Sequence, residues 1–178
     1  MAISTGSIIK FEYMMSGGPP MIVTAVAQTD TTGFIKGMPM GLDASGEWFR
    51  ATTGKLGPTS NFVEGIALQD YPGAGESLDC VLVTPKTVFS AVVAHATTAS
   101  AVTGSTLIGN IYPIESCATF QGSVASGTFQ MHIASTAFEG GYCMGLKDDA
   151  GTAYGRAYFV FSACYSTESP YFDARSTA

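Results

Sequence analysis

Short segments in which apolar residues alternate with polar ones, or follow one another for a few positions, recur along the whole chain. Alternation with a period of two places apolar side chains on one face of a strand. Thr, Val, Ile, Phe and Tyr, which favour strands, are abundant, whereas helix-forming Leu, Glu, Lys and Arg are scarce. The pattern therefore predicts an all-β protein. The predicted strands lie in residues 7–13, 21–28, 47–51, 62–68, 78–84, 87–93, 106–114, 128–134, 142–146 and 154–165.

Turns rich in Gly, Pro and Asp separate the predicted strands, which favours antiparallel strands folded as a barrel or a sandwich. Two of these turns, at residues 43–46 and 148–151, combine Asp with Gly. An Asp side chain accepts hydrogen bonds from the backbone that follows it, and Gly adopts the positive φ that closes a tight hairpin. Neither turn has the acidic spacing of a calcium-binding loop. We therefore interpret both as hairpin turns.

The segment HATTASAVTG, residues 95–104, is the best candidate for a connector between two units. Residues 1–94 are predicted to form a small antiparallel β-barrel-like unit. Residues 105–166 are predicted to form a second β unit, either a sandwich or a hairpin-rich unit. Both lengths suit small β units. Residues 167–178 are polar and interrupted by a proline, which predicts a C-terminal tail.

Charged residues make up only 12% of the chain and hydrophobic residues 46%, against roughly 25% charged in soluble domains. This composition excludes a disordered chain and favours a surface that is covered in an assembly. The net charge is −6 and the eight Lys and Arg residues are scattered singly. We therefore expect no nucleic acid and no anionic membrane as partner. The apolar runs are too short to span a bilayer and the first residues lack a signal pattern, so we expect synthesis in a cytoplasm.

Residues 141–145 match G-x-C-x-G, the cysteine form of the nucleophile elbow, with His132 and Asp148 as candidate partners of Cys143. The elbow needs a strand, a sharp turn and a helix above a parallel sheet. Here a hairpin turn follows the motif, and alternation of strands and helices is absent. We therefore expect no catalysis at Cys143 and no enzyme.

The remaining candidate chemistry points to packing. His95 and His132 lack the clustered donors of a metal site, and the cysteines form no C-x-x-C pair, so no metal or cofactor is expected. We expect the cysteines to be reduced and buried, although an even number also permits two disulfides. Trp48 is interpreted as a core aromatic, with a sugar-stacking platform as the alternative. The four cysteines are Cys80, Cys117, Cys143 and Cys164.

The segment from Phe34 to Val93 has a distinctive order of turns and apolar positions. It runs KGMPMGLD at 36–43, WFRAT at 48–52, FVEGIAL at 62–68, PGAGE at 72–76, CVLVTP at 80–85 and TVF at 87–89. This order resembles that of the small β-rich capsid decoration (cement) proteins of tailed bacteriophages. The residues after about Ile114 match no family that we recognise.

The resemblance implies a structural virion protein that binds the outer surface of a mature phage capsid and stabilises the lattice of the major capsid protein. Such a protein is synthesised in the host cytoplasm and acts as a homo-oligomer, with a trimer favoured. The alternative is a phage receptor-binding or carbohydrate-binding β module, with Trp48 and tyrosine side chains as the stacking surface.

The candidate capsid-contacting element is an apolar N-terminal arm, which could add a strand to the edge of a partner's sheet. The same residues could equally form an ordinary first strand of this chain. The candidate arm residues are Ile3, Ile8, Ile9, Phe11 and Tyr13.

Overall fold

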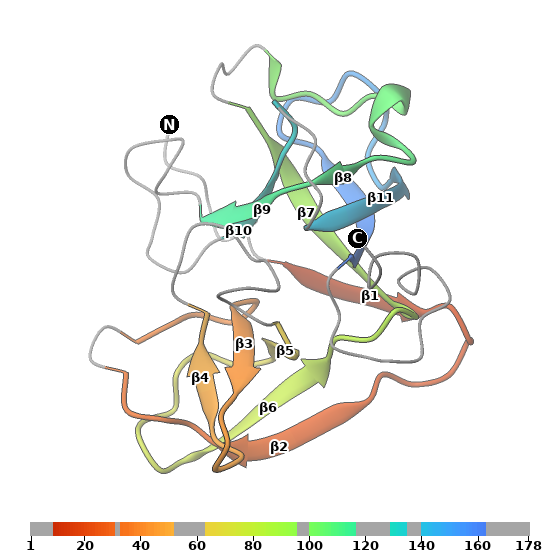
Figure 1. Cartoon of the computed structure of the whole chain (residues 1–178). Helices are drawn as coiled ribbons and strands as arrows, with labels where there is room; N and C mark the ends of the chain where they lie inside the picture. Colours follow the sequence, from red (N-terminus) through yellow and green to blue (C-terminus); the bar gives the residue numbers. More distant parts are fainter. Residues whose placement is uncertain are drawn as a thin grey trace, which may run out of the picture.

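The computed structural model describes residues 9–30, 33–51, 63–95, 100–116, 129–134 and 140–162. Within these ranges the chain forms strands and one short 3-10 helix, and no α-helix (Figure 1). The all-β prediction is confirmed. The elements are β1 (Lys10–Met14), β2 (Ile22–Val26), β3 (Pro39–Leu42), β4 (Trp48–Arg50), β5 (Gly65–Ala67), β6 (Ser77–Leu82), β7 (Thr87–Ala94), η3 (Ser105–Leu107), β8 (Ile111–Tyr112), β9 (Ile114–Ser116), β10 (Phe129–His132), β11 (Gly141–Leu146) and β12 (Arg156–Phe161).

Five antiparallel strands in the order β2-β6-β5-β3-β4 form the lower part of the molecule in Figure 1. The two edges of this sheet meet just beyond β2, where Ala27 forms a bridge with Trp48. The Gln28 N–H donates to the carbonyl of Trp48 at 2.9 Å. The sheet therefore curls round towards closure, and we call it the first barrel. Its interior holds Trp48, Cys80 and other buried apolar side chains.

The remaining strands form a larger sheet in the order β8-β11-β12-β7-β10-β9, with β1 paired to β7. Its two end strands, β8 and β9, are consecutive in the chain and separated by Pro113 alone. The continuous segment 111–116 thus pairs with β11 through β8 and with β10 through β9, so this sheet is a nearly closed barrel. Proline has no N–H to donate, but the Pro113 carbonyl accepts from the His132 N–H at 2.9 Å. We call this sheet the second barrel.

Strand β7 is the centre of the second barrel. All eight of its residues are buried, because β12 covers one edge while β1 and then β10 cover the other. Phe89 of β7 packs against Phe11, Phe159 and Phe161 with ring centroids 5.6–6.3 Å apart. Edge-to-face and tilted ring pairs of this kind add to the stabilisation from burial.

Strand pairing divides the chain differently from the predicted units at 1–94 and 105–166. Both β1 and β7 precede the predicted connector at 95–104, yet they belong to the second barrel. The chain instead passes between the barrels twice, between β1 and β2 and again at the turn from Thr84 to Thr87, in which the two hydroxyl groups lie 2.7 Å apart. A single hydrophobic core cluster contains residues of both barrels, so neither is an isolated unit. The predicted tail at 167–178 lies outside the described residues.

Both predicted Asp-Gly hairpin turns are confirmed. Between β3 and β4, the Asp43 carboxylate accepts from the N–H groups of Ser45 and Glu47 at 2.8 and 2.9 Å, and Gly46 has φ +77°. These bonds, that from Glu47 first, hold the pKa of the Asp43 carboxyl below its usual value. Between β11 and β12, the Asp148 carboxylate accepts from the Arg156 N–H at 2.7 Å.

A buried arginine joins three strands of the second barrel. Arg156 of β12 donates from Nε to the Ser90 hydroxyl at 2.9 Å and from Nη2 to the Ser90 carbonyl at 2.7 Å. The Ser90 hydroxyl in turn donates to the Glu12 carboxylate of β1, which also pairs with Lys147. Burial lowers the pKa of Arg156, and the charges of Glu12 and Asp148 oppose that shift. The guanidinium therefore depends on these partners to remain buried.

Replacing Ser90 with alanine is expected to lower the free energy of unfolding by about 1–3 kcal/mol, because it leaves Arg156 Nε buried without its acceptor. Chemical denaturation followed by circular dichroism measures the change. Ser77→Ala, at an exposed serine that begins β6, is the matched control and should stay within about 0.5 kcal/mol of the parent. Equal stability of both variants would contradict this account of the network.

Candidate interaction surface

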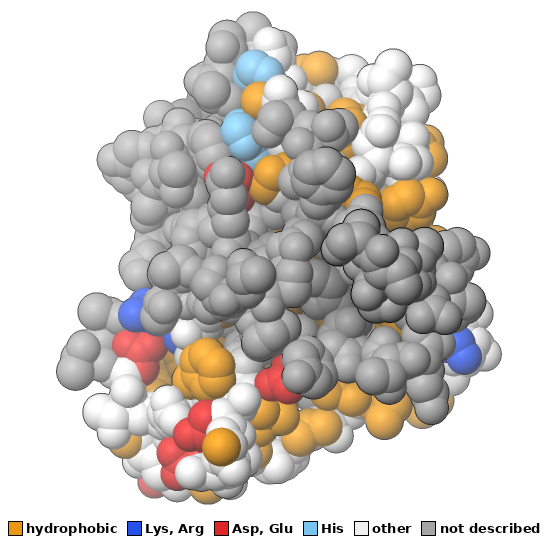
Figure 2. All heavy atoms as spheres, viewed as in Figure 1, with side chains coloured by type: hydrophobic (Ala, Val, Ile, Leu, Met, Phe, Trp, Pro, Cys, Tyr) orange, Lys and Arg blue, Asp and Glu red, His pale blue; other side chains and the backbone are white. Residues whose placement is uncertain are grey.

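Large apolar side chains are exposed along β1, β2 and the turn that joins them. Five of the seven exposed large apolar residues in the described part of the chain lie between positions 13 and 26. Figure 2 shows hydrophobic side chains along β2 at the lower edge of the molecule. We call these five residues the β1–β2 apolar surface. They are Tyr13 (46% exposed), Met15 (45%), Met21 (56%), Ile22 (52%) and Val26 (39%).

The exposure of this surface follows from the period of β2. Ile22, Thr24 and Val26 are exposed, while Val23 and Ala25 alternate with them and pack against the core. In a strand with one buried face, the outward positions are normally polar. Here two of the three outward side chains are β-branched and apolar, so the sequence does not supply the usual polar face.

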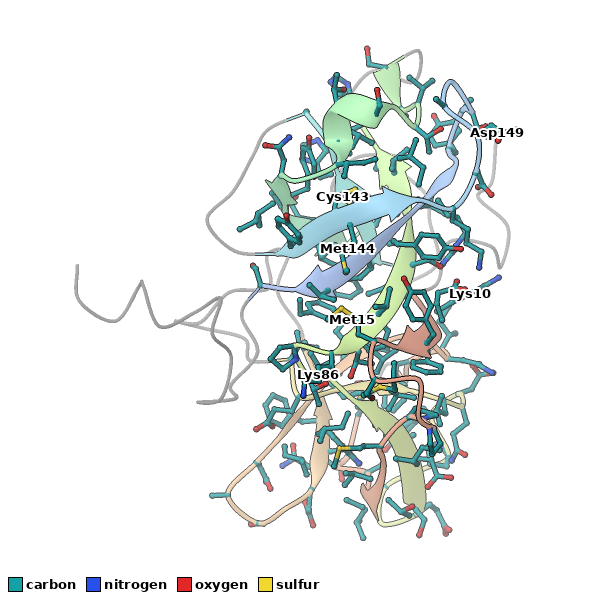
Figure 3. All side chains as sticks on the ribbon, turned by 90° about the vertical axis from the view of Figure 1, so that its right-hand side faces the viewer. Lys10, Met15, Lys86, Cys143, Met144 and Asp149 are labelled. Atoms are coloured by element: carbon teal, nitrogen blue, oxygen red, sulfur yellow. The ribbon has the colours of Figure 1, made fainter. Side chains whose placement is uncertain are left out.

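Backbone hydrogen bonds hold both ends of the β1–β2 turn against the body of the protein. The Met15 N–H donates to the Lys86 carbonyl at 2.9 Å, and the Leu82 N–H donates to the Met21 carbonyl at 2.8 Å. Figure 3 shows Met15 near the junction of the two barrels, with Lys10 and Lys86 on either side of it. The apolar side chains are therefore presented from a fixed backbone, which lowers the entropy lost when a partner binds.

The described part of the predicted N-terminal arm forms an ordinary strand of this chain. β1 pairs with β7 over Lys10–Met14. Ile9 is 2% exposed, and Phe11 is partly buried and packs edge to face on Phe89 with ring centroids 6.3 Å apart. Tyr13 is exposed, and its ring packs edge to face on the Tyr158 ring with centroids 6.1 Å apart. The other predicted arm residues, Ile3 and Ile8, lie outside the described residues.

The sequence pattern did not predict Met15, Met21, Ile22 and Val26 as surface residues. Residues 21–28 were predicted as a strand, and that prediction is confirmed by β2. Most of its apolar residues are adjacent in the sequence and do not alternate with polar ones, so the pattern does not show which side chains face outward. The three consecutive apolar residues Met21, Ile22 and Val23 were the one available sign of an apolar outer face. Such a run places apolar side chains on both faces of a strand, and each of those faces is then expected to be covered.

Cys143 lies in a hairpin and is fully buried. It belongs to β11, which is followed by a turn and β12, so the G-x-C-x-G motif occupies no nucleophile elbow. Burial raises the pKa of the thiol, and its Sγ lies 3.7 Å from the Gly145 carbonyl oxygen. Of the two candidate partners, His132 lies on β10 beside His95, with ring centroids 6.4 Å apart, and the Asp148 carboxylate accepts from the Arg156 N–H in the β11–β12 turn.

Trp48 is a core residue, as interpreted from the sequence. It is 1% exposed, so it cannot serve as the exposed stacking platform of the alternative function. Cys80 and Cys143 are free and buried, and Cys117 and Cys164 lie outside the described residues. Across the ranges that the structure describes, no group of three His, Cys, Asp or Glu side chains is placed to hold a metal ion.

Cys80 and Cys143 are expected to resist alkylation in the folded protein. Desolvation, with a smaller effect of the Asp79 charge, raises the pKa of Cys80 to about 12. The reactive species is the thiolate, so neither thiol should react at about pH 8. Peptide mapping by mass spectrometry after treatment with iodoacetamide measures this. Both cysteines should be labelled in guanidinium chloride, and labelling of either in the native protein would show that the barrels open readily.

The sequence matches no model of a known protein family, and no similar sequence was found among curated proteins. In the described part of the chain, no helix has the length and apolar character required to cross a membrane.

Proposed function

We propose that this chain is a structural virion protein that binds the outer surface of a mature phage capsid and stabilises the lattice of the major capsid protein. The observation that carries the proposal is the β1–β2 apolar surface. A monomer in water gains nothing from exposing five large apolar side chains in one region, whereas burying them against a partner is favourable.

Two further features support a role in assembly. The segments that resemble decoration proteins at 36–43, 48–52, 62–68 and 80–85 include β3, β4, β5 and the end of β6, which all belong to the first barrel. The low content of charged residues, 12% of the chain, suits a protein whose surface is partly covered by neighbours.

The proposed mechanism requires no catalysis. A protein that binds the mature lattice and not its precursor stabilises the mature state by mass action. Many copies on one shell, and a homotrimer that contacts several capsid subunits at once, increase the effect through avidity.

Exchange of Ile22 for aspartate is expected to weaken capsid binding at least about tenfold, since it places a charge in an interface that must be dry. Purified protein is mixed with expanded empty capsids, and the bound fraction is measured by co-sedimentation. Ile108→Asp is the matched control, because Ile108 is 46% exposed in the second barrel and lies outside the β1–β2 apolar surface.

Saturable, near-stoichiometric binding of the parent and of Ile108→Asp, with loss in Ile22→Asp, would support the proposal. Absence of binding by the parent protein would contradict it. Light scattering during size-exclusion chromatography tests the trimer separately, and a strict monomer at micromolar concentration would remove that part of the proposal.

A further inference from the structure

The outer edge of β2 has no partner strand over its first residues. In the described part of the chain, β2 is the end strand of the first barrel and pairs with β6 alone until Ala27 forms the bridge with Trp48. Figure 1 shows β2 at the lower border of the molecule, with β6 on its inner side. The N–H and carbonyl groups along such an edge are a template for pairing with another chain.

Hydrogen bonds between β2 and β6 fix the direction of the backbone groups of β2. The Leu82 N–H donates to the Met21 carbonyl at 2.8 Å, and the Ala27 N–H donates to the Glu76 carbonyl at 2.9 Å. The register between the two strands is continuous over Ile22–Val26. In an antiparallel pair, alternate residues bond to the same neighbour, so the odd-numbered residues of β2 bond to β6.

The even-numbered residues therefore direct their N–H and carbonyl groups to the outer edge. The Gln28 N–H has this direction, because it donates to the Trp48 carbonyl across that edge at 2.9 Å. Ile22 and Thr24 come before the bridge and have no such neighbour strand among the described residues. Their two N–H and two carbonyl groups form a short ladder, which an extended backbone of about four residues would complete.

β2 has none of the usual protections of an edge strand. Free edges are commonly blocked by charged side chains, by proline or by a bulge. β2 has the sequence IVTAV and pairs with β6 without a bulge. Its outward side chains are those of Ile22, Thr24 and Val26, and all three residues are exposed. An added strand would therefore find free backbone groups and β-branched side chains beside it, and such neighbouring pairs stabilise sheets.

The charges beside β2 restrict the kind of segment that can pair with it. β2 and β6 contain no Lys or Arg, and their one acidic residue is Asp79. The Asp79 carboxylate accepts from the Thr24 hydroxyl, so it lies beside the outer edge. Glu76, opposite Ala27, is exposed. An acidic segment would be repelled here, whereas an apolar segment next to a Lys or Arg is complementary in charge.

We infer that an extended apolar segment of the partner, next to a Lys or Arg, adds as a strand to the edge of β2 at Ile22 and Thr24. This inference rests on the proposed function, in which the partner is the major capsid protein. Main-chain hydrogen bonds supply affinity in strand addition, and side chains at alternate positions supply specificity. The β1–β2 apolar surface is then a strand-pairing site, with Ile22 and Val26 contributing apolar burial.

Proline at position 24 tests the pairing, because it removes one outward N–H and leaves the hydrogen bonds between β2 and β6 in place. Thr24→Pro is expected to weaken binding to expanded empty capsids at least about tenfold, measured by co-sedimentation. Thr24→Val keeps the N–H and removes only the hydroxyl, so it is the matched control and should bind as the parent does. Circular dichroism checks that both variants are folded.

Hydrogen exchange is a second measurement, and it needs no variant. In the free protein, the amides of Ile22 and Thr24 should exchange faster than those of Val23 and Ala25, which bond to β6. In the capsid complex, exchange at Ile22 and Thr24 should slow at least about tenfold. Mass spectrometry with electron-transfer fragmentation of a peptide covering 21–26 resolves the individual amides.

Weaker binding of Thr24→Pro but not of Thr24→Val, with slower exchange at Ile22 and Thr24, would support strand addition. If folded Thr24→Pro binds as the parent does while Ile22→Asp does not, the capsid function stands and strand addition is wrong. Unchanged exchange at both amides in the complex would also overturn the inference, and this result decides if Thr24→Pro does not fold. A parent dimer that Thr24→Pro converts to a monomer would identify a second copy as the occupant and overturn it too.

Discussion

Replacing Trp48 with alanine is expected to lower the free energy of unfolding by about 3–5 kcal/mol, the range for large aromatic residues in well-packed cores. Trp48 is 1% exposed and lies at the point where the first barrel closes on itself. Gly65 and Cys80 face its ring across the interior, and a Cβ on Gly65 would lie 2.8 Å from both Trp48 Cη2 and Cys80 Cβ. The ring thus fills the interior so closely that its removal leaves a cavity.

Guanidinium denaturation followed by circular dichroism measures this loss, because the variant has no tryptophan fluorescence. Trp48→Phe keeps an aromatic ring in the interior and should lose clearly less stability than Trp48→Ala. Phe49→Ala tests the neighbouring half-buried position, where the ring lies over Gly41 on β3. A loss below about 1 kcal/mol for Trp48→Ala would show that the first barrel does not depend on a packed interior.

A methyl group on Gly140 is expected to destabilise the second barrel by at least about 3 kcal/mol. Gly140 has φ +144°, and an added Cβ would lie 2.1 Å from the carbonyl oxygen of Tyr112, which belongs to β8. The atom in the way belongs to the backbone, so rotation of a side chain cannot relieve the clash. Gly140 also exchanges hydrogen bonds with Ser162, at 2.8 Å from its N–H to the Ser162 hydroxyl. The substitution would therefore separate β8 from β11, where the barrel closes.

Gly151→Ala is the matched control for Gly140→Ala. Gly151 also has positive φ, +89°, but an added Cβ there has nothing within 4 Å. Gly151→Ala should lower the free energy of unfolding only by the strain of placing alanine at a positive φ, roughly 1–2 kcal/mol. Both are measured by chemical denaturation, and by recovery of soluble protein if Gly140→Ala fails to fold. Equal losses in the two variants would show that contact with Tyr112 is not the cause.

The segments predicted as strands contain most of the observed ones, with informative exceptions. β3 was not predicted. It begins with Pro39, and proline is tolerated at the first position of a strand; the Pro39 carbonyl accepts from the Ala51 N–H at 3.1 Å. Residues 106–114 were predicted as one strand but begin in η3 and reach β8 only at Ile111. Gly109, with φ +87°, interrupts that run.

The candidate surface was less predictable than the strands. Tyr13 was identified from its apolar neighbours, yet in the same run Ile9 is buried in the core and Phe11 is partly buried against it. The position of a residue on the inner or outer side depends on which strand lies beside it. For β1 that partner is β7, more than seventy residues away in the chain, from Lys10 opposite Ser90 to Met14 opposite Thr87.

The sequence by itself determined the all-β class and both Asp-Gly hairpins, because period-two alternation and turn chemistry are local properties of a few neighbouring residues. It also indicated that Trp48 is a core residue and that Cys143 occupies a hairpin. Only the tertiary structure decided that β1 and β7 join the second barrel, that Ala27 and Trp48 bring the edges of the first barrel together, and that Ile22 faces solvent. Those features arise from pairing between distant segments, which depends on how the whole chain buries its apolar surface and not on local preference.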